Sequence, residues 1–253
     1  MTRQAATLQR GKEVSIAYHH TPGQTPGVLF CTGFKSDMTG SKALALEAFC
    51  RENGQQFTRF DYQGHGESSG RFEDGTIGEW LADTLAVIDE ITKGPLIIVG
   101  SSMGGWVGLL AALARPDRVK GFIGIATAID FTRRILDGID DDARTLLETE
   151  GVWMRPSEYD PEGYPITLSL LEEGRNHLLL PGPIEFGGVV RLLHGQLDDA
   201  VPWRGSLDIA EALTSTDVAV TCIKDAGHRL SRDQDIARIL GATAEITEVL
   251  RGA

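Results

Sequence analysis

The stretch Pro95-Leu-Ile-Ile-Val-Gly-Ser-Ser-Met-Gly104 decides the fold of this chain. An apolar run of the length of a buried strand leads into the pattern Gly-x-Ser-x-Gly around Ser102, and a helix rich in small residues follows up to Ala112. Glycines on both sides of a serine relieve crowding in a sharp strand-to-helix turn, which lifts the hydroxyl off the edge of a sheet. The stretch predicts a nucleophile elbow with Ser102 as the nucleophile; an ordinary strand–helix turn that contains serines is the simpler alternative.

A serine nucleophile needs a histidine base and a carboxylate that orients the histidine, in the chain order serine, acid, histidine. Asp198 follows the apolar run 189–193, and His228 follows the apolar run 218–223. Because the carboxyl ends of parallel strands meet at one edge of a sheet, we expect Ser102, Asp198 and His228 to meet there. These three residues are the predicted catalytic triad.

Other acids and histidines are weaker candidates. Asp199 is the neighbour that could replace Asp198, whereas Asp225 and Asp233 lie too close in sequence to His228 to be preferred. We expect the remaining histidines to be structural or solvated, with His65 the first to check: His19, His20, His65, His177 and His194. None of the three cysteines, Cys31, Cys50 and Cys222, occupies an elbow, so none is a candidate nucleophile.

The turn after the predicted central strand 27–31 should complete an oxyanion hole. Its sequence is Thr32-Gly-Phe34, and we expect the backbone N–H of Phe34 to act together with that of Met103 at the start of the elbow helix. A glycine turn without a catalytic role would have the same sequence.

Composition excludes several classes of function. The chain has 253 residues, 42% hydrophobic and 24% charged, as in a globular protein with a large core. Its net charge of −12 argues against nucleic acid as a partner. The sequence has no run of 18 apolar residues, so stable membrane insertion is not expected. The odd number of cysteines, without a C-x-x-C pair, predicts neither a disulfide framework nor a zinc site. Without an apolar signal or an arginine-rich leader, the sequence predicts a cytoplasmic protein.

Short apolar runs alternate with helical periodicity, which is typical of βα units on a mostly parallel sheet. The expected buried strands are 27–31, 57–61, 96–100, 119–125, 189–193 and 218–223, after an N-terminal hairpin of 6–9 and 14–18. Residues 128–188 depart from this rhythm, with an acidic stretch and several prolines. A structureless loop of that length is unusual in a compact domain, so we predict a lid inserted into a single domain spanning 1–253.

Longer motifs resemble those of the α/β-hydrolase family. They are Phe60-Asp-Tyr-Gln-Gly-His-Gly-Glu-Ser68, the elbow extended to Trp106, and His194-Gly-Gln-Leu-Asp-Asp-Ala-Val-Pro-Trp203. The likeness covers most of the chain from about residue 27, lid included, and is most specific to the branch of mitochondrial palmitoyl-protein thioesterases and acyl-glucuronide esterases. The resemblance implies the α/β-hydrolase fold and the same triad, with Asp198 rather than Asp199 as the acid.

The sequence therefore predicts a serine esterase or thioesterase that works through an acyl-enzyme on Ser102, on a small-molecule or acylated-protein substrate. No metal or organic cofactor is expected. A peptidase, a carbon–carbon bond hydrolase or a perhydrolase would use a similar triad, and a non-catalytic protein could use the fold to bind a small ligand. No motif specifies the oligomeric state.

Overall fold

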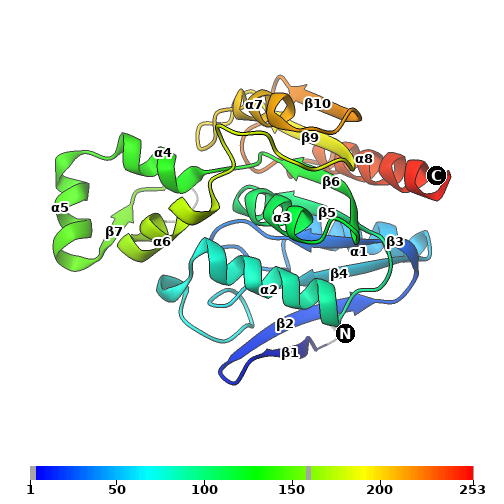
Figure 1. The fold of residues 1–253 in the computed structure, drawn as a ribbon, viewed down its shortest axis with the longest axis horizontal. Helices are drawn as coiled ribbons and strands as arrows, with labels where there is room; N and C mark the ends of the chain where they lie inside the picture. The colour runs from blue at the N-terminus through cyan, green and yellow to red at the C-terminus, as the bar shows by residue number, and fades with distance from the viewer. Residues whose placement is uncertain (1–3, 158–160, 253) are drawn as a thin grey trace.

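The computed structural model describes residues 4–157 and 161–252. Eight strands form one sheet in the order β1-β2-β4-β3-β5-β6-β9-β10, with helices on both faces (Figure 1). The strands are β1 (Ala6–Arg10), β2 (Val14–Thr21), β3 (Gln24–Cys31), β4 (Gln55–Phe60), β5 (Leu96–Ser101), β6 (Val119–Ile125), β9 (Val189–Gly195) and β10 (Val218–Ile223). β1 and β2 are antiparallel to their neighbours, whereas β4, β3, β5, β6, β9 and β10 pair in parallel. The predicted hairpin and mostly parallel sheet are confirmed.

Two hydrophobic cores lie on the two faces of the sheet. One is covered by α2 (Ile77–Glu90), α3 (Met103–Ala114) and α7 (Gly205–Ala212), and the other by α1 (Ser41–Glu52) and α8 (Asp233–Gly252). α2 shows why these segments are helical: its buried side chains recur every three or four residues, and the Thr76 hydroxyl caps its first turn by accepting the amide of Glu79. Most strands between these layers are apolar runs, as expected for parallel strands, whereas β4 buries Gln55, Gln56, Thr58 and Arg59.

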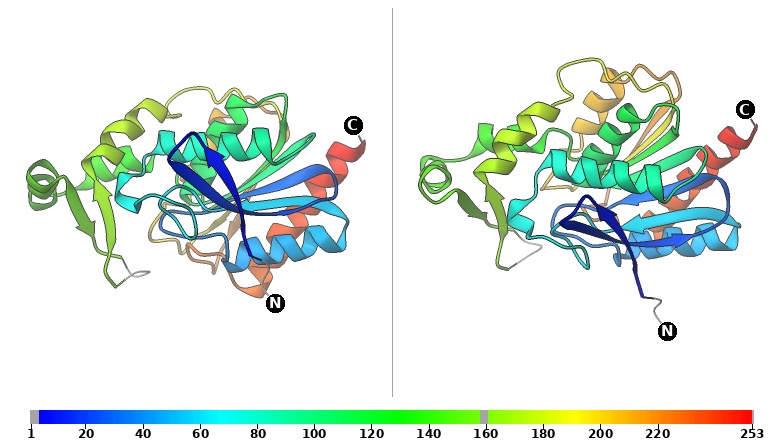
Figure 2. Two further views of the ribbon diagram at one scale, coloured as in Figure 1. Left: turned by 90° about the horizontal axis from the view of Figure 1, so that it is seen from below. Right: turned by 60° about the horizontal axis from the view of Figure 1, so that its bottom comes forward.

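The segment between β6 and β9 projects beyond one end of the sheet (Figures 1 and 2). It contains α4 (Phe131–Gly138), α5 (Asp141–Glu150), the hairpin of β7 (Val152–Arg155) and β8 (Tyr164–Thr167), α6 (Leu168–Glu173) and the 3₁₀ helix η2 (Gly174–His177). We call residues 128–188 the insertion; its residues 158–160 lie outside the described residues. The acidic stretch that opens α5 has a local reason, because the Asp140 carboxylate caps that helix by accepting the amide of Ala143.

The two ends of the insertion are joined to each other, and one of them is also joined to the core. The Asp130 carboxylate accepts the amides of Leu179 and Leu180, each at 2.9 Å, and the indole N–H of Trp106 in α3 donates to the carbonyl of His177 at 3.1 Å. These contacts fix the two ends of the insertion beside the carboxyl edge of the sheet. Over the described ranges, no helix combines the length and apolar character needed to cross a bilayer.

Candidate active site

Ser102 lies at the sharp turn between β5 and α3, in an unusual backbone conformation with φ 54° and ψ −120°. The flanking glycines make this turn possible. A Cβ atom at Gly104 would lie 2.2 Å from the carbonyl oxygen of Thr32, and one at Gly100 would lie 2.3 Å from the carbonyl oxygen of Gly104. Because no side chain fits at either position, the glycines allow the elbow to pack directly against the turn after β3.

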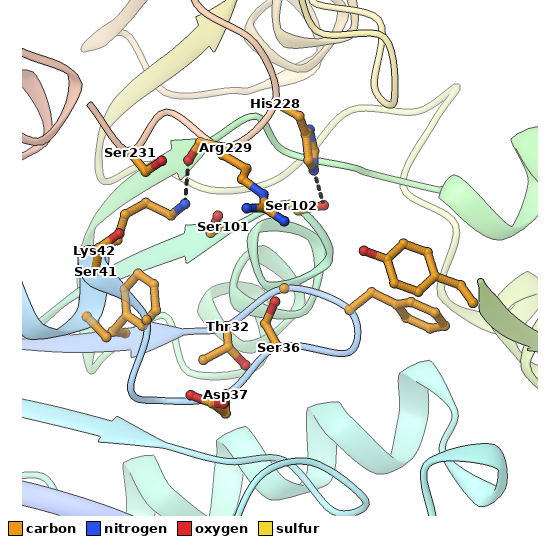
Figure 3. Close-up of a pocket in the computed structure, with 16 residues that line it drawn as sticks. Thr32, Ser36, Asp37, Ser41, Lys42, Ser101, Ser102, His228, Arg229 and Ser231 are labelled. Carbon is orange, nitrogen blue, oxygen red and sulfur yellow. Dashed lines mark hydrogen bonds between the residues drawn. The ribbon is translucent and has the colours of Figure 1, made fainter. Parts of the chain in front are cut away.

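The structure brings Ser102, Asp198 and His228 together beyond the carboxyl ends of β5, β9 and β10. Nε2 of His228 lies 3.1 Å from Oγ of Ser102 (Figure 3). Nδ1 of His228 lies 2.7 Å from Oδ2 of Asp198. With the Nδ1 proton donated to the carboxylate, Nε2 is free to accept the proton of the serine hydroxyl. The predicted residues therefore form one continuous hydrogen-bonded chain.

The carboxylate of Asp198 is fully buried and saturated with hydrogen bonds. Besides His228, the Nε2 atom of His194 lies 3.0 Å from Oδ2, and the amides of Ala200 and Val201 donate to Oδ1 at 3.0 and 2.8 Å. Burial alone would raise the pKa of Asp198, but the hydrogen bonds from His194 and His228 outweigh burial and hold its pKa well below the usual range. Asp198 is thus an ionised acceptor that fixes the orientation of His228.

His194 makes a contact with Asp198 that the sequence did not predict. It was expected to be merely structural, yet its buried ring joins the Asp198 carboxylate to the hydroxyl of Ser206, whose Oγ lies 2.7 Å from Nδ1 of His194. A Ser206 hydroxyl that donates to Nδ1 leaves the Nε2 proton of His194 for Asp198. The spacing of four residues between His194 and Asp198 is the sequence signal that could have suggested this contact.

The weaker candidates lie elsewhere. Asp199 is exposed beside the site, and Asp225 pairs with Arg232 at 2.9 Å instead of facing the histidine. His65 is buried among aromatic rings, including that of Trp80 at 5.3 Å, and burial lowers its pKa to about 4. Burial raises the pKa of both Cys31 and Cys50 to about 12, which makes them unreactive thiols.

The turn after β3 lies directly beside the elbow. β3 and β5 are parallel, with Cys31 paired to Gly100, so residues 32–34 run next to residues 101–103. A Cβ atom at Gly33 would lie 3.4 Å from Cβ of Ser102. Phe34 and Met103 both line the same small cavity as Ser102, and the amide of Met103 belongs to the first turn of α3, where N–H groups have no acceptor within the helix.

Two cavities meet at Ser102 and His228. The larger, which we call the polar cavity, encloses about 280 Å³ and lies below the His228 loop (Figure 3). Its polar lining includes Ser36, Asp37, Ser41, Lys42, Arg229 and Ser231. The Lys42 ammonium donates to the carbonyl of Arg229 at 2.5 Å, and burial together with the Arg229 charge lowers the pKa of Lys42 to about 8.

The second, which we call the inner cavity, encloses about 100 Å³ between the elbow and the insertion. Its apolar lining is Phe34, Met103, Ala128, Phe131, Ile135, Ile166, Ala200 and Val201, and it also receives Tyr164, Arg134 and Arg155. Phe34 packs edge-on against Phe131 and Tyr164 of the insertion, with ring centroids 5.7 Å apart in both pairs. Within the described ranges, no group of three or more His, Cys, Asp or Glu side chains is arranged to hold a metal ion.

Comparison with known proteins points to one family. Residues 26–162 match the family model Hydrolase_4, described as "Serine aminopeptidase, S33". The chain is 41% identical over 96% of its length to the mitochondrial palmitoyl-protein thioesterase ABHD10 of Bos taurus, covering 80% of that protein. Among solved structures it is similar to alpha/beta hydrolase domain-containing protein 10 from mouse, with TM-score 0.92 and 39% identity over 98% of this chain and 100% of that one. A putative hydrolase from Agrobacterium vitis has TM-score 0.91 and 39% identity over 96% and 97%.

These relatives correct one expectation. The prediction of a cytoplasmic location is wrong, because relatives 41% identical to this chain are mitochondrial by name. That prediction was drawn from the residues near the N-terminus and from the cysteine pattern. A targeting leader is a separate segment that takes no part in the fold, so features of the folded core do not indicate the compartment.

Proposed function

Since this chain belongs to the α/β-hydrolase family, we propose that it cleaves carboxylic ester or thioester bonds through an acyl-enzyme on Ser102. Family membership makes the chain a hydrolase. The observation that supports the residue roles is the unbroken chain of contacts from Oγ of Ser102 through His228 to the buried carboxylate of Asp198.

In the first half-reaction, Oγ of Ser102 attacks the carbonyl carbon while its proton passes to Nε2 of His228. Asp198 holds the imidazole in the productive tautomer and stabilises the imidazolium that forms. The developing oxyanion lies at the turn between the amides of Phe34 and Met103, which are the proposed donors. Collapse of the tetrahedral intermediate breaks the bond to the leaving oxygen or sulfur, which takes the proton from Nε2.

In the second half-reaction, a water molecule replaces the leaving group. His228 removes a proton from this water as it attacks the acyl-enzyme, and the same amides hold the second oxyanion. The intermediate collapses to release the carboxylic acid, and Oγ of Ser102 recovers its proton from Nε2. The groups that carry these steps are Ser102, His228, Asp198, the two proposed amide donors and water.

The two cavities suggest where the two halves of the substrate bind. The inner cavity is small and mostly apolar, so we assign the acyl group to it; the polar cavity is wider and carries charged and hydroxyl side chains, so we assign the leaving group to it. We further propose that the insertion is a lid on a single domain, because Phe131 and Tyr164 close the inner cavity over Ser102 from the insertion side.

An aminopeptidase is the second candidate, because the matching family model carries that description. Such an enzyme has to bind a substrate ammonium group close to the nucleophile. The inner cavity instead receives the guanidinium groups of Arg134 and Arg155, which repel an ammonium group. Esters and thioesters of carboxylic acids meet no such repulsion, and the structure therefore favours them.

Hydrolysis of three substrates with one acyl size tests the proposal. We expect the purified enzyme to cleave p-nitrophenyl butyrate and a butyryl thioester, with no turnover above background in Ser102→Ala. We expect alanine p-nitroanilide, a peptidase substrate of similar size, to be cleaved at least a hundredfold more slowly. Faster cleavage of the anilide than of both acyl substrates would overturn the ester and thioester assignment in favour of the peptidase.

A further inference from the structure

Beyond the triad, two arginines of the insertion line the inner cavity. A third space of about 270 Å³, which we call the outer cavity, lies next to it. Arg134, Ile135, Arg155 and Ala200 line both spaces, so the two arginines stand at the boundary between them. Arg134 comes from α4 and Arg155 from the last residue of β7, so two separate elements of the insertion deliver the charges.

The two positive charges reinforce each other at the cavity. Among residues 4–157 and 161–252, neither arginine forms an ion pair with a carboxylate; the polar contact of Arg134 is a long one of 3.4 Å from Nη2 to the carbonyl of Ala200. Burial of part of its side chain lowers the pKa of Arg134, and the charge of Arg155 lowers it further, whereas Asp198 acts in the opposite direction. Arg134 is exposed, so water screens part of the repulsion between the two arginines, and an anion bound between them would offset the rest.

This positive site contrasts with the rest of the chain. The protein has a net charge of −12, and several of its other arginines pair with carboxylates, as the buried Arg59 does with Glu47 at 2.9 Å. The outer cavity also receives Asp199, an exposed carboxylate that offsets part of the charge at the mouth. Deeper in, the walls between Ser102 and the arginines are apolar, formed by Phe131, Ile135 and Ile166. The inner cavity thus combines apolar walls next to Ser102 with two arginines at its boundary with the outer cavity.

From this arrangement, and resting on the proposed function, we propose that the enzyme prefers acyl groups that end in a carboxylate: half-esters or half-thioesters of short dicarboxylic acids. Arg134 and Arg155 would bind the distal carboxylate while the carbonyl lies against Ser102. The hydrolysis is otherwise unchanged. The acyl–oxygen or acyl–sulfur bond breaks, one water is consumed, and the products are a dicarboxylate and the free alcohol or thiol.

The size of the inner cavity sets the length of the acid. The inner cavity encloses only about 100 Å³, which favours a short acid. A glutaryl group, with three methylene groups between the scissile carbonyl and the distal carboxylate, is the short acyl group that we compare with a neutral one.

A matched pair of substrates tests the subsite. p-Nitrophenyl glutarate and p-nitrophenyl valerate have acyl groups of equal carbon number that differ in the distal charge. We expect wild-type kcat/KM for the glutarate to exceed that for the valerate by about tenfold, and this ratio to fall at least tenfold in Arg134→Gln and in Arg155→Gln. Arg144→Gln, which removes the same charge from α5 away from both cavities, should leave the ratio unchanged.

Two further measurements need no variant. Raising the ionic strength from 0.05 to 0.5 M should reduce the glutarate rate several-fold more than the valerate rate, because salt screens the attraction. Free glutarate should also inhibit valerate hydrolysis at lower concentration than free valerate does. A wild-type preference for the valerate, or a ratio that the arginine variants do not change, would overturn the anion subsite. If the proposed function itself were wrong, the result would differ: neither ester would be cleaved in a reaction that requires Ser102.

Discussion

The carboxyl edge of the sheet and the insertion both line the candidate active site, but they are held in place differently. At the sheet edge, backbone pairing fixes each residue: Cys31 is in register with Gly100, and Ser102 follows the strand end by one residue. In the insertion, Arg134 and Arg155 are held by helix and hairpin packing outside the sheet. The comparison teaches that, under the proposed function, the edge carries the bond-breaking groups and the insertion selects the acyl group. Mutations at the edge should therefore abolish reaction, and mutations in the insertion should change preference.

The largest effect is expected at the elbow. Ser102→Ala should lower kcat/KM for p-nitrophenyl butyrate by about four to six orders of magnitude, because the members of a triad act as a unit. Ser169→Ala, an exposed serine on α6 of the insertion, is the matched control and should stay within about twofold of wild type. Thermal unfolding of both variants checks that the fold is kept. A correctly folded Ser102→Ala enzyme with wild-type turnover would rule out Ser102 as the nucleophile.

The next largest effect distinguishes the catalytic roles of two adjacent carboxylates, Asp198 and Asp199. Asp198→Asn should lower kcat by about 10³ to 10⁴, because it removes the charge that stabilises the imidazolium and favours the wrong tautomer of His228. Asp199→Asn should cost no more than about threefold on a neutral ester, since Asp199 is exposed. Steady-state kinetics of the two variants decide between them, and a larger loss at Asp199 would move the acid role to that residue.

A smaller effect is expected from His194. His194→Gln should lower kcat by roughly tenfold, in the range for one hydrogen bond to a charged group. Because Asp198 has a lowered pKa and stays ionised, the acid limb of the pH profile should have a slope of one in wild type, reporting one proton. Losing the bond from His194 leaves more negative charge facing His228, so the limb should move to higher pH in the variant. An unmoved limb with the same rate loss would mean that His194 only supports the fold.

The smallest effect concerns neutral acyl groups in the inner cavity. Each methylene buried in the transition state should raise kcat/KM by roughly fourfold, from about 0.8 kcal/mol of transfer free energy. The gain should stop within a few methylenes, because the inner cavity encloses only about 100 Å³. A series of p-nitrophenyl esters from acetate to dodecanoate measures this, and a steady fall from acetate upward would show that the insertion only packs against the core.

The same two regions show how much of the fold and of the candidate site can be predicted from the sequence. The strands and elbow were predictable because buried parallel strands are continuous apolar runs and because steric crowding leaves glycine as the fitting residue at Gly100 and Gly104. Residues 128–188 stood out only as a break in that rhythm, and their role as a lid stays a prediction. The β7–β8 hairpin, and the placement of Arg134 and Arg155 at one cavity, depend on tertiary packing that no local period encodes. The contact of His194 with Asp198 was missed for the same reason.

The central claim is that Ser102 is the activated nucleophile, and covalent labelling tests it most directly. Wild-type protein treated with a fluorophosphonate probe should gain one label, located by peptide mass spectrometry on the peptide that contains Ser102. Labelling should be absent in Ser102→Ala and at least a hundredfold slower in His228→Gln, which keeps the serine but removes its base. A label on another residue, or rapid esterase turnover by protein that the probe leaves unlabelled, would contradict the assignment.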